Sequence, residues 1–155
     1  MTDDGSLDTP PDDGHVERHV ALMSRIPKLS AFTPAELVVL AQDATERTLP
    51  PGVDIYVEGA VAESFAIVVS GTITKRGMRN KQPLGPDTVV GTLPLLRRAE
   101  YLRRRTASLL TLTDVVLLDV PYAGLDRLLP ERKEAFLDGV AEEALTLIEK
   151  LEHPE

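Results

Sequence analysis

Between Thr48 and Val120 the chain consists of short segments rich in β-branched residues, separated by glycine, proline and aspartate. Segments of this kind form strands, and Gly59, Gly71 and Gly85 mark turns between them. Many short strands at close, regular spacing indicate a sandwich or jelly roll without a parallel sheet. The predicted strands are 53–57, 65–69, 71–75, 88–90, 106–111 and 114–120.

Helical patterns flank this β region on both sides. On the N-terminal side we predict a short helix over 15–24 and a second helix that starts at Thr33, where Thr33 caps and Glu36 closes a capping box. On the C-terminal side we predict a short helix over 122–129 and a long one over 131–151.

The long C-terminal helix carries a narrow apolar stripe. Such a stripe packs on the rest of its own chain or against a second copy of itself, and the sequence leaves both options open. The stripe consists of Phe136, Val140, Ala144, Leu147 and Leu151.

Length and composition set the broad class of protein. With 155 residues, of which 43% are hydrophobic, the chain has room for one compact domain with its own core. Residues 1–14 are acidic and polar, so we expect a disordered tail followed by a single domain over 15–155. There is no cysteine, no secretory signal and no apolar run that could cross a membrane, so we expect a cytoplasmic protein without a membrane partner.

The charge is distributed unevenly along the chain. The formal net charge is −8, and five aspartates lie within residues 1–14, yet residues 75–105 hold nine basic groups against two acidic ones. An acidic protein is a poor partner for nucleic acid, so we expect no nucleic-acid binding. The local basic cluster suits a small anion or an acidic protein surface, and a solvated surface loop is the simpler alternative.

The histidines argue against a metal site and against one class of enzyme. His15 and His19 are four residues apart on the predicted first helix, but no other histidine or cysteine is near, so we expect no bound metal. A jelly-roll enzyme of the cupin kind needs histidine and glutamate ligands on its strands. The third histidine, His153, also lies outside the β region, so we expect a protein that is not an enzyme.

Four short motifs occur in the order and spacing of one known family. They are Pro50-Pro51-Gly52, Ile55-Tyr56-Val57-Glu58-Gly59, Ser64-Phe65-Ala66-Ile67-Val68-Val69-Ser70-Gly71 and Leu84-Gly85-Pro86-Asp87. Together they resemble the cyclic-nucleotide-binding domain family, from about Met23 to about Leu151. The resemblance implies a mainly β fold of the α+β class. We expect an antiparallel, catabolite-activator-like β-roll of about eight short strands over 48–120, between helices over 15–46 and 122–152.

Residues 90–108 resemble the phosphate-binding cassette of that family. The resemblance implies that Arg105 pairs with a cyclic phosphate and that Gly91, Thr92 and Leu93 form the start of a short helix whose N–H groups face it. Thr106 and Ala107 complete the second half of the cassette, and a threonine at position 106 would suit a guanine base.

The cassette departs from the family pattern at three points. Thr92 replaces the glutamate that binds the ribose, and losing such a charged hydrogen bond costs about 1.5–3 kcal/mol. Pro94 replaces an alanine that donates an N–H to the phosphate, and proline has no N–H. The 13 positions from Thr92 to Arg105 exceed the usual spacing by three or four, which leaves open whether Arg105 reaches the pocket.

These observations support two functional hypotheses. The first is a non-enzymatic regulatory or protein-interaction module that has weakened or lost ordinary cAMP and cGMP binding and needs no cofactor. The alternative is a sensor of a cyclic nucleotide (cGMP, cAMP or a cyclic dinucleotide) or another anionic ligand through a modified pocket. The chain ends at Glu155 without a helix-turn-helix, so we expect its output to pass through another protein or through self-association by the C-terminal helix.

Overall fold

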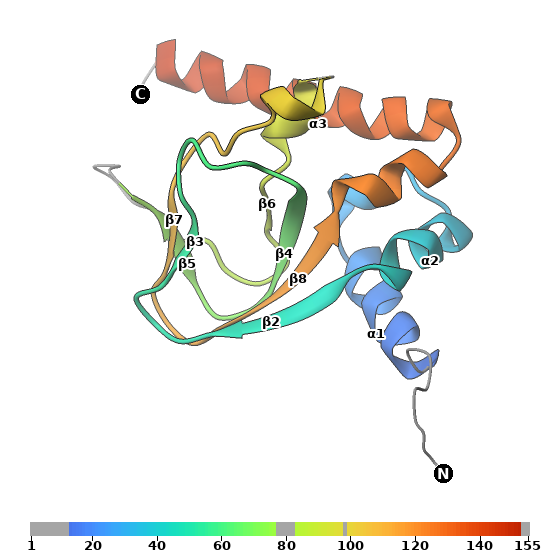
Figure 1. Ribbon diagram of the computed structural model, residues 1–155, viewed down its shortest axis with the longest axis horizontal. Coiled ribbons are helices and arrows are strands. Elements are labelled where there is room, and N and C mark those ends of the chain that lie inside the picture. The colour runs from blue at the N-terminus through green and yellow to red at the C-terminus, as the bar shows by residue number, and fades with distance from the viewer. Residues whose placement is uncertain (1–12, 77–82, 98, 153–155) are drawn as a thin grey trace.

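Two antiparallel sheets form the centre of the protein, and the computed structural model describes residues 13–76, 83–97 and 99–152 (Figure 1). The four-stranded sheet has the order β2 (Thr45–Leu49), β8 (Val115–Pro121), β4 (Ser64–Ser70) and β6 (Val89–Val90). The three-stranded sheet has the order β3 (Asp54–Tyr56), β7 (Leu109–Thr111) and β5 (Ile73–Lys75). The predicted antiparallel β-roll between flanking helices is therefore confirmed, with seven strands in the described residues.

The central strand β4 separates two hydrophobic cores. Successive side chains of a strand point to opposite faces of its sheet. Phe65 and Ile67 accordingly belong to the core shared with the helices, whereas Ala66 and Val68 belong to the core between the two sheets. Because β4 is buried on both faces, its sequence is a nearly continuous apolar run, and this run made it recognisable as a strand.

Strand β8 alternates in the same way, and this alternation places a charged residue inside the roll. Leu118 and Val120 join the core beneath the helices, while Val115 and Leu117 join the core between the sheets. Asp119 has the same parity as Leu117, so its carboxylate faces the interior of the roll.

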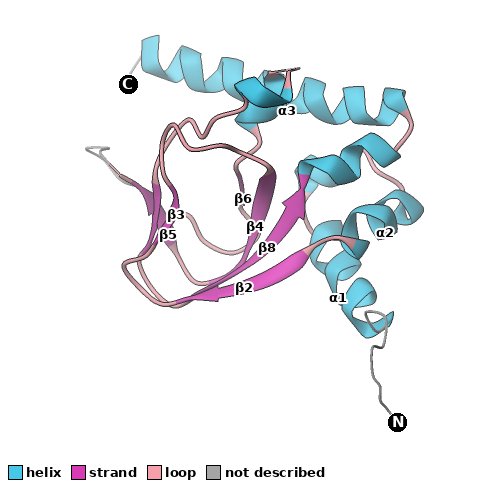
Figure 2. Cartoon of the chain, in the orientation of Figure 1, coloured by secondary structure: helices cyan, strands magenta, loops and turns pink. Residues whose placement is uncertain are grey.

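The helices lie outside the roll (Figure 2). Two of them, α1 (Asp13–Ser24) and α2 (Pro34–Gln42), precede the strands in the sequence. The predicted capping box of α2 is confirmed. The Thr33 hydroxyl accepts a hydrogen bond from the Glu36 N–H at 3.2 Å, and the Glu36 carboxylate accepts one from the Thr33 N–H at 2.8 Å. A 3-10 helix, η1 (Pro27–Leu29), joins the two helices.

The long C-terminal helix α3 (Pro130–Glu152) crosses one end of the roll (Figure 1). The Phe136 ring lies 5.4 Å from the ring of Phe32 and 5.8 Å from that of Phe65, centroid to centroid, and Val140 is also buried. The first half of the apolar stripe therefore packs within the chain. The side chains of Leu147 and Leu151 lie outside the described part.

Three segments differ from the sequence-based expectation. Thr45–Leu49 forms strand β2 where we expected the helical region to reach residue 46; as an edge strand it is mostly polar and lacks an apolar signal. The predicted helix over 122–129 is the 3-10 helix η4 (Tyr122–Arg127). Residues 13 and 14, assigned to the acidic tail, belong to α1. The remainder of the tail, Arg79, Lys81, Arg98 and His153 lie outside the described residues.

Candidate functional site

A cavity of about 320 Å³ opens into the β-roll between the two sheets. Its walls come from β2, β3, β4 and β8 and from the loop that precedes β7. The formal charge of its lining is +1, from two arginines and one aspartate. The lining residues are Arg47, Ile55, Tyr56, Val57, Ala60, Val61, Ser64, Arg105 and Asp119.

Backbone pairing fixes the position of Arg105 at the cavity wall. The Arg105 N–H donates to the Ala60 carbonyl at 2.7 Å, and the Gly59 N–H donates to the Arg105 carbonyl at 2.9 Å. One step earlier, Arg104 forms a bridge with Val61. These bonds clamp the end of the arginine-rich loop against residues 59–61 and turn the Arg105 side chain inward, so the arginine that the sequence singled out does line the cavity.

The Arg105 guanidinium is buried, with 8% of the residue exposed. Nη1 donates a hydrogen bond to the Ser64 carbonyl oxygen at 2.8 Å, and Cζ lies 3.5 Å from the centroid of the Tyr56 ring, a close cation–π contact. Among the described residues, no carboxylate forms an ion pair within 4.0 Å of this guanidinium. A buried cation is ordinarily paired, so the positive charge of Arg105 is available to an anion.

Gly91 brings the cassette backbone against the guanidinium. Its φ of +88° lies in the left-handed region, and a Cβ at this position would lie 2.7 Å from the Tyr56 hydroxyl and 2.9 Å from Arg105 Nη1. Its carbonyl accepts a hydrogen bond from the Tyr122 hydroxyl. Only glycine permits this approach, so Gly91 packs directly behind two residues of the cavity wall, Tyr56 and Arg105.

A second charged group, the Arg47–Asp119 pair, also lines the cavity. Arg47 Nε lies 2.6 Å from Asp119 Oδ2, an ion-pair distance without hydrogen-bond alignment, and Asp119 Oδ1 has no hydrogen-bond partner among the described residues. Burial raises the pKa of Asp119, although the positive charges of Arg47 and Arg105 act in the opposite direction.

The Tyr56 hydroxyl is another buried polar group in the cavity wall. It has no hydrogen-bond partner among the described residues, and burial raises the pKa of its phenol. Buried polar atoms normally have partners, so the Tyr56 hydroxyl and Asp119 Oδ1 are two unsatisfied polar atoms in residues that line the cavity.

The six cassette residues predicted from the sequence are only partly brought together. Arg105 lines the cavity, and the Gly91 backbone lies against the Arg105 guanidinium. Thr92 is buried but is absent from the cavity lining, and its side chain makes no capping hydrogen bond. Leu93 begins a four-residue 3-10 helix, η2 (Leu93–Leu96), and packs on the helical core. In the second half of the cassette, residue 106 is exposed, residue 107 is half-buried, and neither lines the cavity.

The described residues of the cassette loop between Arg97 and Arg105 do not line the cavity. They include the 3-10 helix η3 (Glu100–Leu102), on which Tyr101 is 79% exposed. Because the loop is anchored again at residues 103–105, its added length does not withdraw Arg105 from the wall. The Arg103 guanidinium lies 5.6 Å from the centroid of the Tyr122 ring and contributes to this anchor.

Sequence reasoning missed four polar contributors to the cavity. Tyr56 and Ser64 were noticed only as fold motifs, because a backbone acceptor and a ring contact leave no pattern in sequence. Asp119 carried a signal, since it interrupts the apolar run of β8. Arg47 lay in the strand that was not predicted, and its diagonal placement beside Asp119 depends on the β2–β8 register, in which Thr45 pairs with Asp119.

Residues 46–132, more than half of the chain, match the sequence profile of the family described as Cyclic nucleotide-binding domain. A search of curated proteins finds no match. No helix in the described residues is long and apolar enough to span a membrane.

Solved structures share this fold at low sequence identity. One described as Sp-2Cl-cAMPS bound to PKAR CBD2 has a TM-score of 0.69 and 18% identity, over 88% of this chain and 91% of that one. A cyclic nucleotide-binding-like protein from Brucella abortus has a TM-score of 0.57 and 23% sequence identity, over 71% of this chain and 96% of that one. The regulatory subunit of a cAMP-independent protein kinase A from Trypanosoma brucei has a TM-score of 0.63 and 21% sequence identity, over 86% of this chain and 46% of that one. This chain therefore spans about half the length of that subunit.

Proposed function

Because the chain belongs to the cyclic nucleotide-binding domain family, we propose that it is a non-catalytic regulatory module that holds a small anionic ligand against Arg105. The ligand class that fits best is a cyclic mononucleotide, whose phosphate carries one negative charge. Its affinity is expected to be well below that of an intact cassette.

The observation that carries this proposal is the state of the Arg105 side chain. The guanidinium is buried, lines a cavity and lacks a carboxylate partner among the described residues. Its contacts to the Ser64 carbonyl and the Tyr56 ring stabilise the charge without neutralising it. A phosphate in the cavity supplies the missing negative charge and accepts charge-assisted hydrogen bonds.

Two features of the cassette lower the expected affinity for cAMP or cGMP. Thr92 offers no carboxylate to a ribose, and Pro94 offers no N–H to a phosphate. Each missing contact to a charged group costs about 1.5–3 kcal/mol, and two together move a micromolar site toward the millimolar range. The half-buried Asp119 carboxylate also opposes a second negative charge in the cavity.

The size of the cavity favours a mononucleotide over a cyclic dinucleotide. Sites for small molecules generally enclose about 300–1,000 Å³, and the cavity of about 320 Å³ lies at the low end of this range. A cyclic dinucleotide has twice the atoms of a mononucleotide and two negative charges.

The second candidate function is an interaction module that needs no ligand. The specific observation that favours it is that Arg105 already contacts the Ser64 carbonyl and the Tyr56 ring within the protein, while Tyr101 and Leu102 are exposed on η3, a few residues earlier in the chain. The similar trypanosome subunit is described as part of a cAMP-independent kinase. In this alternative, the partner is another protein or a second copy bound through α3, and the mass of the chain in solution distinguishes the two.

Titration calorimetry with cAMP, cGMP and a cyclic dinucleotide separates the two candidates. The proposal predicts saturable binding of a cyclic mononucleotide with weak affinity, and none of the dinucleotide. Absence of heat with every ligand at millimolar concentration would favour the ligand-free interaction module.

A further inference from the structure

Three side chains with metal-binding atoms converge outside the β-roll, in a hollow of about 460 Å³ between α1 and the start of β2. His15, His19 and Glu46 each offer one such atom, and these atoms all lie within 4.8 Å of one another. The cassette cavity does not include these residues.

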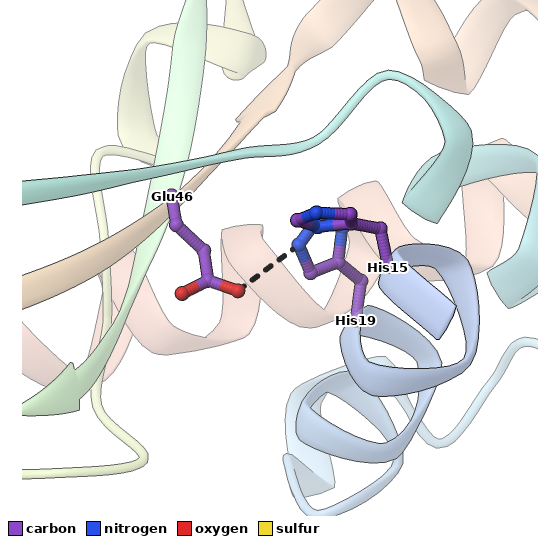
Figure 3. A group of neighbouring side chains, drawn as sticks. All are labelled: His15, His19 and Glu46. Carbon is purple, nitrogen blue, oxygen red and sulfur yellow. Dashed lines mark hydrogen bonds and ion pairs between the residues drawn. The ribbon is translucent and has the colours of Figure 1, made fainter. Parts of the chain in front are cut away.

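The fold brings the three residues together from two elements. His15 and His19 are one turn apart on α1, so both rings project from the same face of the helix. Glu46 lies on the edge strand β2, and Figure 3 shows its carboxylate pointing toward the two imidazoles. The His15 ring is exposed, and its centroid lies 5.9 Å from that of the buried His19 ring.

The hydrogen bonds of His19 orient one ring nitrogen toward Glu46. Nδ1 lies 3.3 Å from the Ala41 carbonyl oxygen, and Nε2 lies 3.3 Å from Glu46 Oε2. The Ala41 carbonyl and the Glu46 carboxylate can both only accept, so the neutral ring donates to one of them, and in the tautomer with the proton on Nδ1 the Nε2 lone pair faces the carboxylate oxygen. In that tautomer Nε2 and Glu46 Oε2 offer two lone pairs to a metal ion, although the Arg18 guanidinium already lies 2.7 Å from the same carboxylate oxygen.

A histidine that ligates a metal typically donates its other N–H to a carbonyl or carboxylate, and the Ala41 carbonyl lies where His19 Nδ1–H would donate. Ligands held at about 2.0–2.2 Å from a tetrahedral ion lie roughly 3.4 Å apart, close to the 3.3 Å between His19 Nε2 and Glu46 Oε2. The ligand atom of His15 lies within 4.8 Å of the other two, so the proposed site requires His15 to move closer when the metal binds.

We propose that His15, His19 and Glu46 bind a divalent transition metal of the Zn²⁺ class. Two imidazoles and one carboxylate suit Zn²⁺, Co²⁺ or Ni²⁺, whereas Mg²⁺ and Ca²⁺ prefer oxygen ligands. Three protein ligands leave a coordination position open for water or for a fourth group. The bound ion would fasten α1 to β2 and so tie the N-terminal helix to the roll.

The sequence-based expectation of no metal site rested on the scarcity of histidine and cysteine. It did not include a carboxylate from strand β2, because that strand was not predicted. After α2, which packs against α1, the chain begins β2 next to α1. Glu46 therefore lies beside two histidines that are 27 and 31 residues away in sequence.

Arg18 competes with a metal for Glu46, which makes the proposal sharply testable. Arg18 Nε lies 2.7 Å from Glu46 Oε2, and Nη2 donates to Oε1 at 3.3 Å. This arginine lowers the pKa of Glu46 and keeps the carboxylate ionised, but it also occupies the oxygen that a metal would take. Removal of Arg18 should therefore strengthen metal binding, whereas removal of a ligand should weaken it.

The test is competition between the tag-free, full-length protein and a chromophoric chelator for Zn²⁺. We expect one Zn²⁺ per chain, and no displacement by Mg²⁺ or Ca²⁺. His15→Ala and Glu46→Gln should each weaken binding by about 10- to 100-fold or more, and Arg18→Gln should strengthen it. His15 is exposed, so His15→Ala should retain the wild-type circular dichroism spectrum and remain interpretable even if a His19 variant unfolds.

His153→Ala is the matched control, because it removes the third histidine of the chain, which is not one of the three proposed ligands. Its affinity for Zn²⁺ should equal that of the wild type. The proposal is overturned if the wild type shows no saturable binding at micromolar zinc, or if His15→Ala, Glu46→Gln and His153→Ala all bind zinc as the wild type does.

Discussion

At the scale of single residues, the neighbours of Gly91, Arg105 and Asp119 determine what each of them contributes to the cavity. Gly91 supplies empty space in a left-handed conformation, and this space admits the Arg105 guanidinium. Asp119 is an ordinary carboxylate that the β8 alternation turns into the roll. The sequence identifies Arg105 through its motif, but the partners that hold it become visible only in three dimensions.

Replacement of Gly91 by alanine should destabilise the protein. The new Cβ would meet the Tyr56 hydroxyl and Arg105 Nη1 at less than 3.0 Å, in a backbone conformation unfavourable to alanine, so we expect a loss of about 1–3 kcal/mol in the free energy of unfolding. Urea denaturation measures it. Gly85→Ala is the control, because a Cβ at Gly85 meets nothing within 4 Å, and equal losses for the two variants would contradict this role of Gly91.

The Asp119 carboxyl should make stability fall with rising pH. Burial raises its pKa above the ordinary value of 3.8, so the native state binds this proton more tightly than the unfolded state does. Stability from this group is therefore greatest below pH 3.8 and decreases as the pH rises through the raised pKa.

The difference in unfolding free energy between the wild type and Asp119→Asn measures this contribution. The difference, wild type minus variant, should decrease as the pH rises from 3.8, and an increase would contradict the assignment. The same comparison for Asp114→Asn, at an exposed position in the turn before β8, serves as the carboxyl-to-amide control.

At the scale of elements, strands and helices with strong apolar patterns were predictable and those without were not. Strand β4 and the capping box of α2 follow directly from their residues. Strand β2 escaped prediction because its edge position leaves Glu46 and Arg47 on a largely polar segment. Each of these two residues contributes to a different candidate site, so the missing strand also concealed the Arg47–Asp119 pair and the metal-binding cluster.

Helix α3 should hold the domain together through one face. Phe136 is fully buried between Phe32 and Phe65, so Phe136→Ala should cost about 3–5 kcal/mol of unfolding free energy. Leu145→Ala, on the same helix with a side chain that is largely exposed, should stay within about 0.5 kcal/mol of the wild type. Thermal or urea denaturation of both variants tests this, and a large loss for Leu145→Ala would instead indicate that its face is covered by a partner.

At the scale of the whole molecule, the order of motifs was sufficient to predict the β-roll and its flanking helices. It was not sufficient to predict the occupant of the cavity, because ligand binding depends on which charged and polar side chains the two sheets place inside the roll. Arg105, Asp119 and the Tyr56 hydroxyl come from three distant parts of the chain, and their balance is set by strand register. The order of sequence motifs thus determines the fold, whereas the charged and polar groups inside the roll determine which ligand can bind.

The measurement that tests the central claim most directly is calorimetric titration of cAMP and cGMP into the wild type, Arg105→Ala and Arg104→Ala. Arg104 is the neighbouring, exposed arginine, so its variant controls for the loss of one positive charge. We predict binding to the wild type and to Arg104→Ala with a Kd of about 0.1–1 mM, and no detectable binding to Arg105→Ala. Equal binding by all three proteins, or binding lost in both variants alike, would contradict the claim that the buried Arg105 guanidinium holds the anion.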